Sequence, residues 1–286
     1  TIVIATLRKS TITSKIKRKN VANSVIVDKS SNSASGVGGT TLNDGLTYGT
    51  YPFGTRVQDP VICLNVPDVV KIHGIFESKD TNDAVAPSMT TGSLDGPTAT
   101  TNDLVIGEEI VGTISGARAT YLVRVNDTNI RFAYKNNTVF TNGEVINFIT
   151  SGVSAVANSV SIGSKNVTGD YTLSNGQKNT IYDFSRIVRK PNAEAATRQL
   201  TVYYDNAYYE SSDDGDITIA NSYDNFDYGS EIPSINDVRC TDLIDARPRV
   251  SNYTVASTDT RSPLEFYGRT FNAAGNSATN ILASDE

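Results

Sequence analysis

The amino-acid sequence predicts an all-β protein: a β-sandwich with an inserted small SH3-like barrel, plus extended N- and C-terminal arms. Valine, isoleucine and tyrosine, which favour strands, dominate the apolar residues, with 14 tyrosines and a single methionine. Thr, Ser, Asn, Asp and Gly are abundant and supply turns and solvated sheet faces. Long runs of Ala, Leu, Glu and Lys, which would indicate helices, do not occur.

The first 60 residues predict an arm with little core of its own. Short apolar groups at 2–4, 12–16 and 25–27 indicate two or three extended segments. The tract from 30 to 60 is rich in Gly, Ser, Thr and Asn and is typical of an irregular or linker-like segment. Such a segment gains order by folding onto a neighbouring subunit.

The first strong strand pattern follows at 68–76. Val70, Ile72 and Phe76 share one face, and Lys71 and His73 share the other, which is the period of a half-buried strand.

Residues 104–150 have the pattern of a compact β unit. Tyr121, Val123 and Val125 are expected on one strand face, and the returning strand is expected to point its apolar residues inward. Asn142-Gly143 between two apolar runs predicts a hairpin turn. The string Gly-Glu-x-Ile occurs at 107–110 and again at 143–146, which is weak evidence for a repeat. The inward residues are Ile130, Phe132 and Tyr134.

Beyond residue 166, a second Asn-Gly pair at 175–176 predicts a turn. Ile181, Phe184 and Val188 have helical spacing, so a short helix is expected from about residue 179 to Pro191. Leu200, Val202 and Tyr204 are expected on one face of a following strand.

These elements predict five segments. Residues 1–60 form the N-terminal arm, residues 61–103 together with 151–225 form the sandwich, 104–150 form the inserted barrel, and 226–286 form an extended C-terminal segment. Insertion at a surface loop is tolerated when its two ends lie close together. The chain begins in a strand-like run and stops without a closing element, which predicts an excerpt of a longer polypeptide or a processed product.

Charge is unevenly distributed along the chain. The net charge is -6, yet the six charged residues before Asp28 are all basic. A basic arm on an acidic body could dock on an acidic partner or on nucleic acid. The basic run lacks interleaved aromatic residues, which disfavours nucleic-acid binding. We therefore favour a solvated edge strand whose Lys and Arg side chains prevent pairing with other chains.

Two isolated cysteines, Cys63 and Cys240, fit a protein assembled in a reducing cytoplasm, and no apolar run is long enough to span a membrane. The sequence predicts neither a cofactor nor an enzyme. His73 is the only histidine, which excludes multi-histidine metal centres, and we interpret it as an exposed or interface residue rather than part of a triad.

Carboxylates offer two further candidate sites. Asp242 and Asp245 could form the acid pair of a glycoside hydrolase, but pairing of Asp245 with Arg247 or Arg249 is favoured. A second group could bind Ca²⁺, although its spacing does not match an EF-hand and a plain Asp-Gly turn is favoured. This second group consists of Asp213, Asp214 and Asp216.

Tyrosines cluster in the last third of the chain. Tyrosine at this density suits protein interfaces and sugar-binding surfaces alike, and we favour a subunit interface together with core. The candidate interface residues are Tyr203, Tyr204, Tyr208, Tyr209, Tyr223, Phe226 and Tyr228.

Several motifs, in order, resemble a family of virion structural proteins of contractile-tailed phages, especially phages of cyanobacteria. They are VPDVVKIHGIFES, VTGDYTLSNGQ, IYDFSRIVRKP, GDIT and DLIDARPR, and they cover roughly half of the chain. The resemblance implies a tail or baseplate component, on which fibres could be mounted, and brings no catalytic residues. The expected partners are other virion proteins and copies of the chain itself. A receptor- or glycan-binding module of a tail fibre, which would contact a host-surface glycan, is the alternative.

Overall fold

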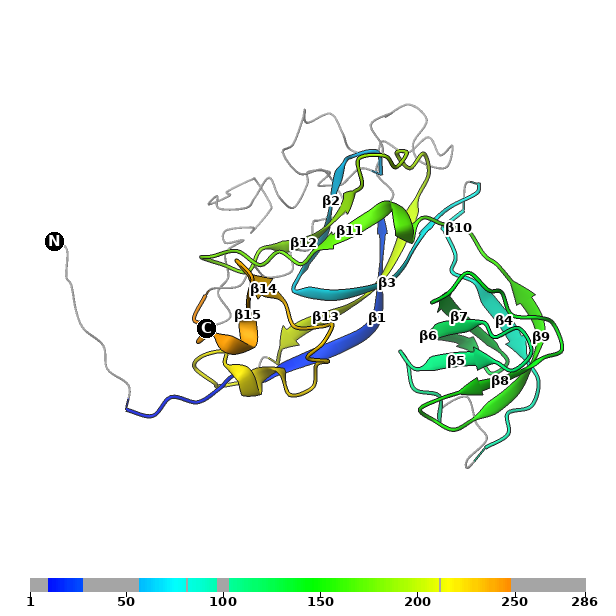
Figure 1. The fold of residues 1–286 in the computed structure, drawn as a ribbon, viewed down its shortest axis with the longest axis horizontal. Helices are drawn as coiled ribbons and strands as arrows, with labels where there is room; N and C mark the ends of the chain where they lie inside the picture. Colours follow the sequence, from blue (N-terminus) through cyan, green and yellow to red (C-terminus); the bar gives the residue numbers. More distant parts are fainter. Residues whose placement is uncertain (1–9, 28–56, 81, 97–102, 211, 248–286) are drawn as a thin grey trace, which may run out of the picture.

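The structure, a computed structural model, describes residues 10–27, 57–80, 82–96, 103–210 and 212–247. Strands and short 3₁₀ turns account for the regular structure of these residues, so the all-β prediction is confirmed. Figure 1 shows two units side by side, a pair of sheets and a barrel, linked by the chain segments around β4 and β10. The predicted arm residues 1–9 and 28–56, and the C-terminal residues 248–286, lie outside the described residues.

The sandwich has two antiparallel sheets. The first has the order β1-β13-β3-β10, and the second has the order β11-β12-β2. The first sheet comprises β1 (Lys17–Val27), β13 (Leu200–Tyr209), β3 (Val69–Glu77) and β10 (Lys165–Asn166); the second comprises β11 (Tyr171–Ser174), β12 (Phe184–Arg189) and β2 (Val61–Pro67).

The core between the two sheets comes from one face of each. Leu200, Val202 and Tyr204 of β13 lie in this core as predicted, together with Ile62 of β2 and Ile187 of β12. All five side chains are buried, and each apolar side chain buried in this way contributes about 1.5–3 kcal/mol to folding.

The barrel is closed and has the strand order β4-β7-β6-β5-β8-β9. It therefore extends from residue 88 to residue 161, further on both sides than the predicted 104–150. The prediction missed β4 because its four residues, SMTT, are too short and too polar to show strand periodicity. The barrel strands are β4 (Ser88–Thr91), β5 (Glu109–Gly112), β6 (Arg118–Asn126), β7 (Asn129–Tyr134), β8 (Val145–Phe148) and β9 (Ser154–Ser161).

The two Gly-Glu-x-Ile strings occupy equivalent places in the barrel. Glu108 accepts hydrogen bonds from the backbone N–H groups of Val105 (2.7 Å) and Ser151 (2.9 Å). Glu144 accepts from those of Thr141 (2.6 Å) and Ser115 (2.9 Å). Each glutamate thus binds the residue three positions before it and the turn that follows the other copy. With β5 and β8 paired antiparallel, the two halves are related by an approximate two-fold axis.

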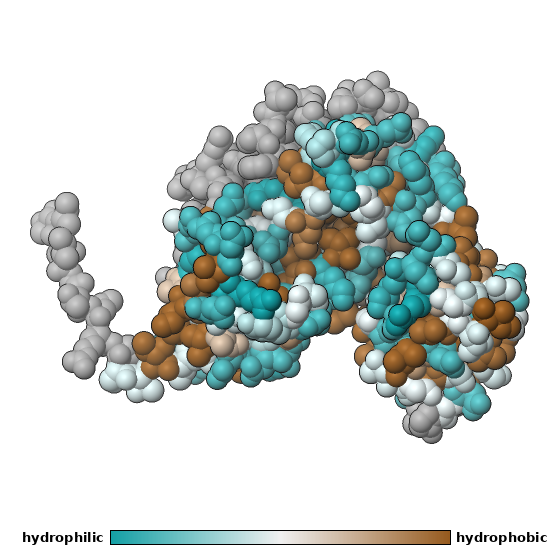
Figure 2. Space-filling model, viewed as in Figure 1, coloured by the Kyte–Doolittle hydropathy of each residue, from teal (hydrophilic) through white to brown (hydrophobic). Residues whose placement is uncertain are grey.

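The barrel packs against the outer face of the first sheet. Phe76 of β3 and Tyr203 of β13, whose rings meet edge to face at 6.0 Å, contact the barrel residues Leu122 and Ala133 through a common apolar cluster. The first sheet therefore carries apolar residues on both faces, which explains the departures from simple alternation. Figure 2 shows the surface indented between the two units.

A bulge in β6 corrects the predicted facing of its residues. The pairing with β7 shifts between Tyr121 and Val123, so Tyr121 points into the barrel core while Val123 lies beside the sheet contact. Val125 is exposed. Ile130 and Phe132 lie in the barrel core, and Tyr134 packs against it, as expected.

Two predicted local elements are wrong. The segment expected to be a helix forms β12, because pairing with β11 and β2 on both sides overrides its helical spacing. Asn142-Gly143 turns with Gly143 at φ +85°, but β8 then pairs with β5 and β9 rather than with the preceding segment.

The segment 17–27 was predicted to belong to an arm, yet it forms the longest strand of the first sheet. β1 pairs with β13 along its length, interrupted by a bulge at Ala22 whose N–H is bound by the Asp205 carboxylate at 2.7 Å. Alternation is hidden in this sequence because the bulge changes the register in mid-strand.

The described part of the C-terminal segment folds against the sandwich rather than extending. Tyr223, Phe226 and Cys240 form a small buried cluster with Ala207 of β13. Short elements run through this part: η4 (Ala220–Tyr223), β14 (Ser234–Ile235), β15 (Val238–Arg239) and η5 (Cys240–Asp242), with η3 (Thr168–Asp170) earlier in the chain.

Candidate functional site: a buried lysine and its partners

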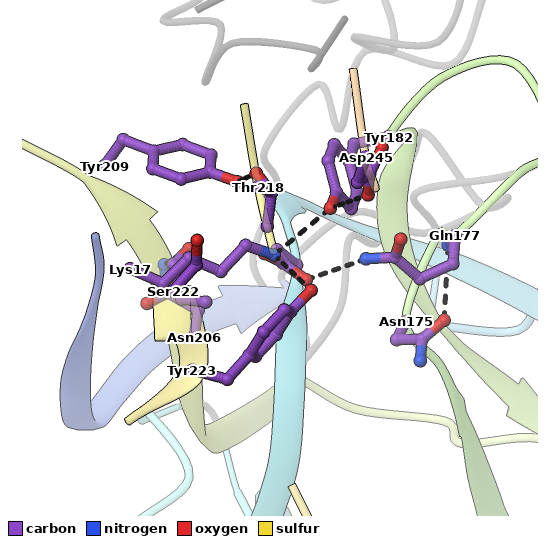
Figure 3. Close-up of polar contacts among 12 residues, drawn as sticks. Lys17, Asn175, Gln177, Tyr182, Asn206, Tyr209, Thr218, Ser222, Tyr223 and Asp245 are labelled. Carbon is purple, nitrogen blue, oxygen red and sulfur yellow. Dashed lines mark hydrogen bonds and ion pairs between the residues drawn. The ribbon is translucent and has the colours of Figure 1, made fainter. Parts of the chain in front are cut away.

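A fully buried lysine lies at the centre of a polar network that joins five segments of the chain. Lys17 of β1 has a side chain with no solvent exposure. Its Nζ donates to Asp68 Oδ2 at 2.7 Å, to the Tyr223 hydroxyl at 2.9 Å and to the Tyr182 hydroxyl at 3.3 Å (Figure 3). The rings of Tyr182 and Tyr223 also lie 4.5 Å from Nζ, close enough for cation–π attraction.

Asp68 is positioned by its backbone conformation. It lies between β2 and β3 with φ +58°, a left-handed conformation that aspartate tolerates better than most residues. Its second oxygen, Oδ1, accepts a hydrogen bond from the Gln177 amide at 2.8 Å. Both carboxylate oxygens are therefore satisfied without water.

A second ion pair extends the network to the C-terminal segment. Arg247 holds Asp245 with two hydrogen bonds, Nε to Oδ1 at 2.8 Å and Nη2 to Oδ2 at 2.6 Å. The Tyr182 hydroxyl donates to the same Asp245 carboxylate, and the Arg247 guanidinium stacks 4.2 Å from the Tyr182 ring. The predicted pairing of Asp245 with Arg247 is confirmed.

The electrostatics keep Lys17 positively charged, Asp245 ionised and Tyr182 neutral at neutral pH. Burial alone would lower the pKa of Lys17, but the Asp68 carboxylate and the surrounding phenols outweigh it and raise that pKa. Burial would raise the pKa of Asp245, yet the Arg247 hydrogen bonds hold it below its usual value. Burial raises the pKa of Tyr182 well above the ordinary value for a phenol.

This arrangement suits a structural role better than a chemical one. A lysine acts as a nucleophile only when it is neutral, and here the charged form is the stabilised one. The two positive side chains, Lys17 and Arg247, are each paired with a carboxylate. The network also joins residues from both ends of the described chain. Removal of any one member would leave an uncompensated buried charge or an unsatisfied hydroxyl.

His73, predicted to be exposed or in an interface, is instead covered by the chain. Its side chain is 3% exposed, and its Nε2 lies 2.6 Å from Asp205 Oδ1. The same Asp205 oxygen accepts the N–H of Ala22 in the β1 bulge. Burial would raise the pKa of Asp205, but His73 and these hydrogen bonds hold it below its usual value.

The predicted tyrosine interface is largely internal. Tyr203, Tyr204, Tyr223 and Phe226 are buried within the chain itself. The rings of Tyr208 and Tyr209 are half-buried on β13. Of the predicted set, only Tyr228 is well exposed, at 56%, and the Arg239 guanidinium stacks on its ring at 4.2 Å.

The aspartates considered as calcium ligands bind the N-terminal segment instead. Asp213 Oδ2 accepts the N–H of Ile16 at 2.7 Å, and Asp216 Oδ2 accepts that of Thr13 at 3.0 Å. Asp213 Oδ1 also accepts the N–H of Gly215 across the expected Asp-Gly turn. Among the described residues, no three His, Cys, Asp or Glu side chains are grouped to hold a metal ion.

The paired-acid alternative is not supported by the contacts. Asp245 is held by Arg247, whereas Asp242 is exposed and accepts the hydroxyl of neighbouring Thr241.

The two cysteines of the chain are buried and do not form a disulfide. Burial raises the pKa of the Cys240 thiol. No helix within the described ranges is long and apolar enough to cross a membrane.

Sequence reasoning missed Lys17 and Asp68, the two central residues. Lys17 belongs to a run of basic residues, and its neighbour Arg18 has a half-exposed side chain. Nothing in that run distinguishes the buried cation from the solvated one, because the partner carboxylate lies 51 residues away.

Comparison with protein-family models, curated proteins and solved structures finds no match to this chain.

Proposed function

We propose that the chain is a structural component of a phage tail or baseplate that assembles through subunit interfaces. The observation that carries this proposal is an apolar patch at one end of the barrel, formed by Val105, Ile106 and Ile149. Their exposed fractions are 46%, 46% and 57%. Exposed apolar side chains on two adjacent loops suit contact with another protein.

The patch is built on a rigid support. Glu108 binds the N–H groups of Val105 and Thr150, so the two loops that carry the patch are held together by one buried carboxylate. A preformed apolar surface loses little conformational entropy when a partner covers it. The motif resemblance to virion proteins indicates that the partners are other virion proteins and further copies of this chain.

The decisive experiment places the chain in an intact particle. In a phage that encodes it, a density map of the virion should accommodate the sandwich and barrel in the tail or baseplate. Absence of the chain from purified particles, or density for it only in the capsid, would contradict the proposal.

The patch itself is tested by charge substitution. Ile149→Glu should reduce incorporation into particles by tenfold or more, because a carboxylate would be buried in an apolar interface. Ile162→Glu is the matched control, since Ile162 is comparably exposed, at 61%, but lies on the connection after β9. Equal incorporation of the two variants would rule out the patch as an interface.

A second candidate function, binding of a host-surface glycan, is favoured by a polar cleft between the sandwich and the barrel.

A further inference from the structure

A cleft of about 600 Å³ lies where the barrel meets the first sheet. Its sheet side carries Ser24 and Ile26 of β1 together with Tyr203 of β13. Thr201 of β13, the linker 82–85 and Arg131 of β7 provide the other lining residues. A volume of this size is within the range of small-molecule sites, which occur preferentially between folded units.

The contact between the barrel and the first sheet covers only part of the sheet and leaves this cleft open. Residues 74 and 76 of β3 pack against Ala133 and its neighbours, which brings the barrel onto the sheet. Ala22 of β1 and Val123 of β6 pack against the same apolar cluster. Beside this contact, β1 carries Ser24 and Ile26, opposite Tyr203 and Thr201 of β13, and the barrel leaves both at least partly exposed.

Arg131 is the central residue of the cleft. Ile130 and Phe132 point into the barrel core, so Arg131 points outward, on the same side as Ala133 at the sheet contact. Its side chain is half-buried and makes no hydrogen bond or ion pair within the described part of the chain. By contrast, Arg118 of β6 is paired with Glu109 at 2.8 Å. Arg131 shares the cleft lining with the exposed Asp83 but pairs with no carboxylate of the described residues, so its guanidinium is available to an anionic group of a ligand.

The other lining groups define the class of ligand. Ser24 offers a hydroxyl, Asn82 an amide and Asp83 a carboxylate, which are groups that exchange hydrogen bonds with vicinal hydroxyls. A carboxylate in the same cleft disfavours a ligand with two or more negative charges, such as a phosphate monoester. A single carboxylate on a polyhydroxylated ligand matches both features.

We propose that this cleft binds a short saccharide that carries a carboxylate, with Arg131 pairing the acid group. Arg131 binds the carboxylate through two parallel N–H···O hydrogen bonds, the geometry in which a guanidinium is most selective. Ser24, Asn82 and Asp83 bind the sugar hydroxyls, and Tyr203 forms part of the floor. The proposal rests on the glycan-binding alternative and is independent of the assembly function.

The test is isothermal titration calorimetry of the full chain with defined trisaccharides. The probes are trisaccharides that carry a single galacturonate, glucuronate or mannuronate residue on two neutral sugars, together with a neutral galactose trimer of equal length. At least one acidic trimer should bind at least tenfold more tightly than the neutral trimer. Arg131→Gln should weaken that binding at least tenfold, and Arg118→Gln, the matched control on the neighbouring strand, should leave it unchanged.

Three outcomes would overturn the proposal. They are no measurable binding of any acidic trimer at millimolar concentration, equal binding by Arg131→Gln, or full competition by acetate at the concentration of the trimer. Thermal unfolding of both variants confirms that they remain folded. Incorporation into particles, scored separately, distinguishes a failure of saccharide binding from a failure of the assembly function, because Arg131→Gln should assemble normally.

Discussion

At the scale of single residues, the most consequential feature is the placement of a charged lysine in a dry interior. Burying an isolated ammonium group in such a place would cost a large free energy of desolvation. Around Lys17, a carboxylate, two phenol hydroxyls and two aromatic ring faces replace the lost hydration. Arrangements of this kind add little net stability compared with a well-packed apolar core, but a packing that buries either charge without its partner is strongly disfavoured.

Replacement of Lys17 should therefore be severe. Lys17→Met removes the cation and leaves Asp68 buried without its charge partner, which should lower the free energy of unfolding by about 3–5 kcal/mol. Urea denaturation followed by tyrosine fluorescence measures this change. Arg18→Met, one residue along, should cost no more than about 0.5 kcal/mol because its partner Glu210 is also solvent-exposed.

A double variant separates charge from shape. Lys17→Met combined with Asp68→Asn removes both charges, so it should be less destabilising than the sum of the two single variants. If the losses in unfolding free energy of the two single variants simply add, Lys17 and Asp68 have no measurable interaction energy, which would contradict the role proposed for their ion pair.

At the scale of elements, the two buried glutamates of the barrel perform the same task in each half. Burial alone would raise the pKa of Glu144, but hydrogen bonds from Ser115, Thr141 and Ile114 bring it below its ordinary value. A carboxylate whose pKa is lower in the folded state stabilises the fold fully above the unfolded pKa of 4.5. This stabilisation is lost as the pH falls through the folded value.

Glu144→Gln should accordingly lower stability at pH 7 by about 1–3 kcal/mol, since four donors lose a charged acceptor. The difference from the unsubstituted chain should shrink as the pH falls below 4.5. Unfolding curves at a series of pH values measure both effects. Glu194→Gln, at an exposed position, is the control and should show neither.

The glycines of the two Asn-Gly turns both have positive φ but differ in the space available for a Cβ atom. Gly143 has φ +85° with open space around the position of a Cβ, so Gly143→Ala should cost about 1–2 kcal/mol from the left-handed conformation alone. Gly176 has φ +81°, and a Cβ there would lie 2.2 Å from the Asp183 carbonyl oxygen. Gly176→Ala should cost more than Gly143→Ala by at least about 1 kcal/mol in thermal or urea unfolding. Equal costs would show that the 175–183 loop can move aside.

The sequence predicted the face of a strand correctly where its apolar residues alternate and failed where polar residues of a strand are buried as well. Leu200, Val202 and Tyr204 of β13 alternate and face the core between the two sheets, although the barrel contact covers Tyr203 on the other face. The pattern around Phe184 and Val188 misleads because β12 is buried between two strands, and its polar residues Ser185 and Arg186 are buried too. The Lys17 network was not foreseeable, since its members come from five separated segments. The Gly-Glu-x-Ile repeat is visible in the sequence, but the structural role of its glutamates is apparent only from the reciprocal hydrogen bonds in the structure.

At the scale of the whole molecule, the barrel has the construction of an insertion. Its first and last strands pair with each other, with Ser88 opposite Ser161, so both ends leave the barrel at one point. Just outside this point, Ser164 N–H bonds the Val85 carbonyl oxygen at 2.9 Å and closes the neck. The barrel also has its own apolar core, separate from that of the sandwich.

A fragment of residues 84–164 should therefore fold alone. Strand-type circular dichroism, a cooperative thermal transition and dispersed amide resonances are the expected results. Phe132→Ala in the same fragment should abolish or strongly lower the transition, because a fully buried aromatic ring costs about 3–5 kcal/mol when truncated. A fragment that lacks cooperative unfolding would show that the barrel needs the Phe76 and Tyr203 contacts of the sheet.

The pairing of β1 with β13 has a consequence for the order of events during synthesis. Val27 pairs with Leu200, which is 173 residues further along the chain. At a translation rate of about 5–20 residues per second, β1 waits roughly 10–35 seconds for its partner, while the barrel, whose contacts are local, is already complete. The first strand of the described chain is thus paired late, and the pair of Asp245 and Arg247 joins the network of its lysine later still. The beginning and the end of the described chain are therefore the last parts to be fixed, and until β13 is made the nascent chain holds an unpaired basic strand that is available to other molecules.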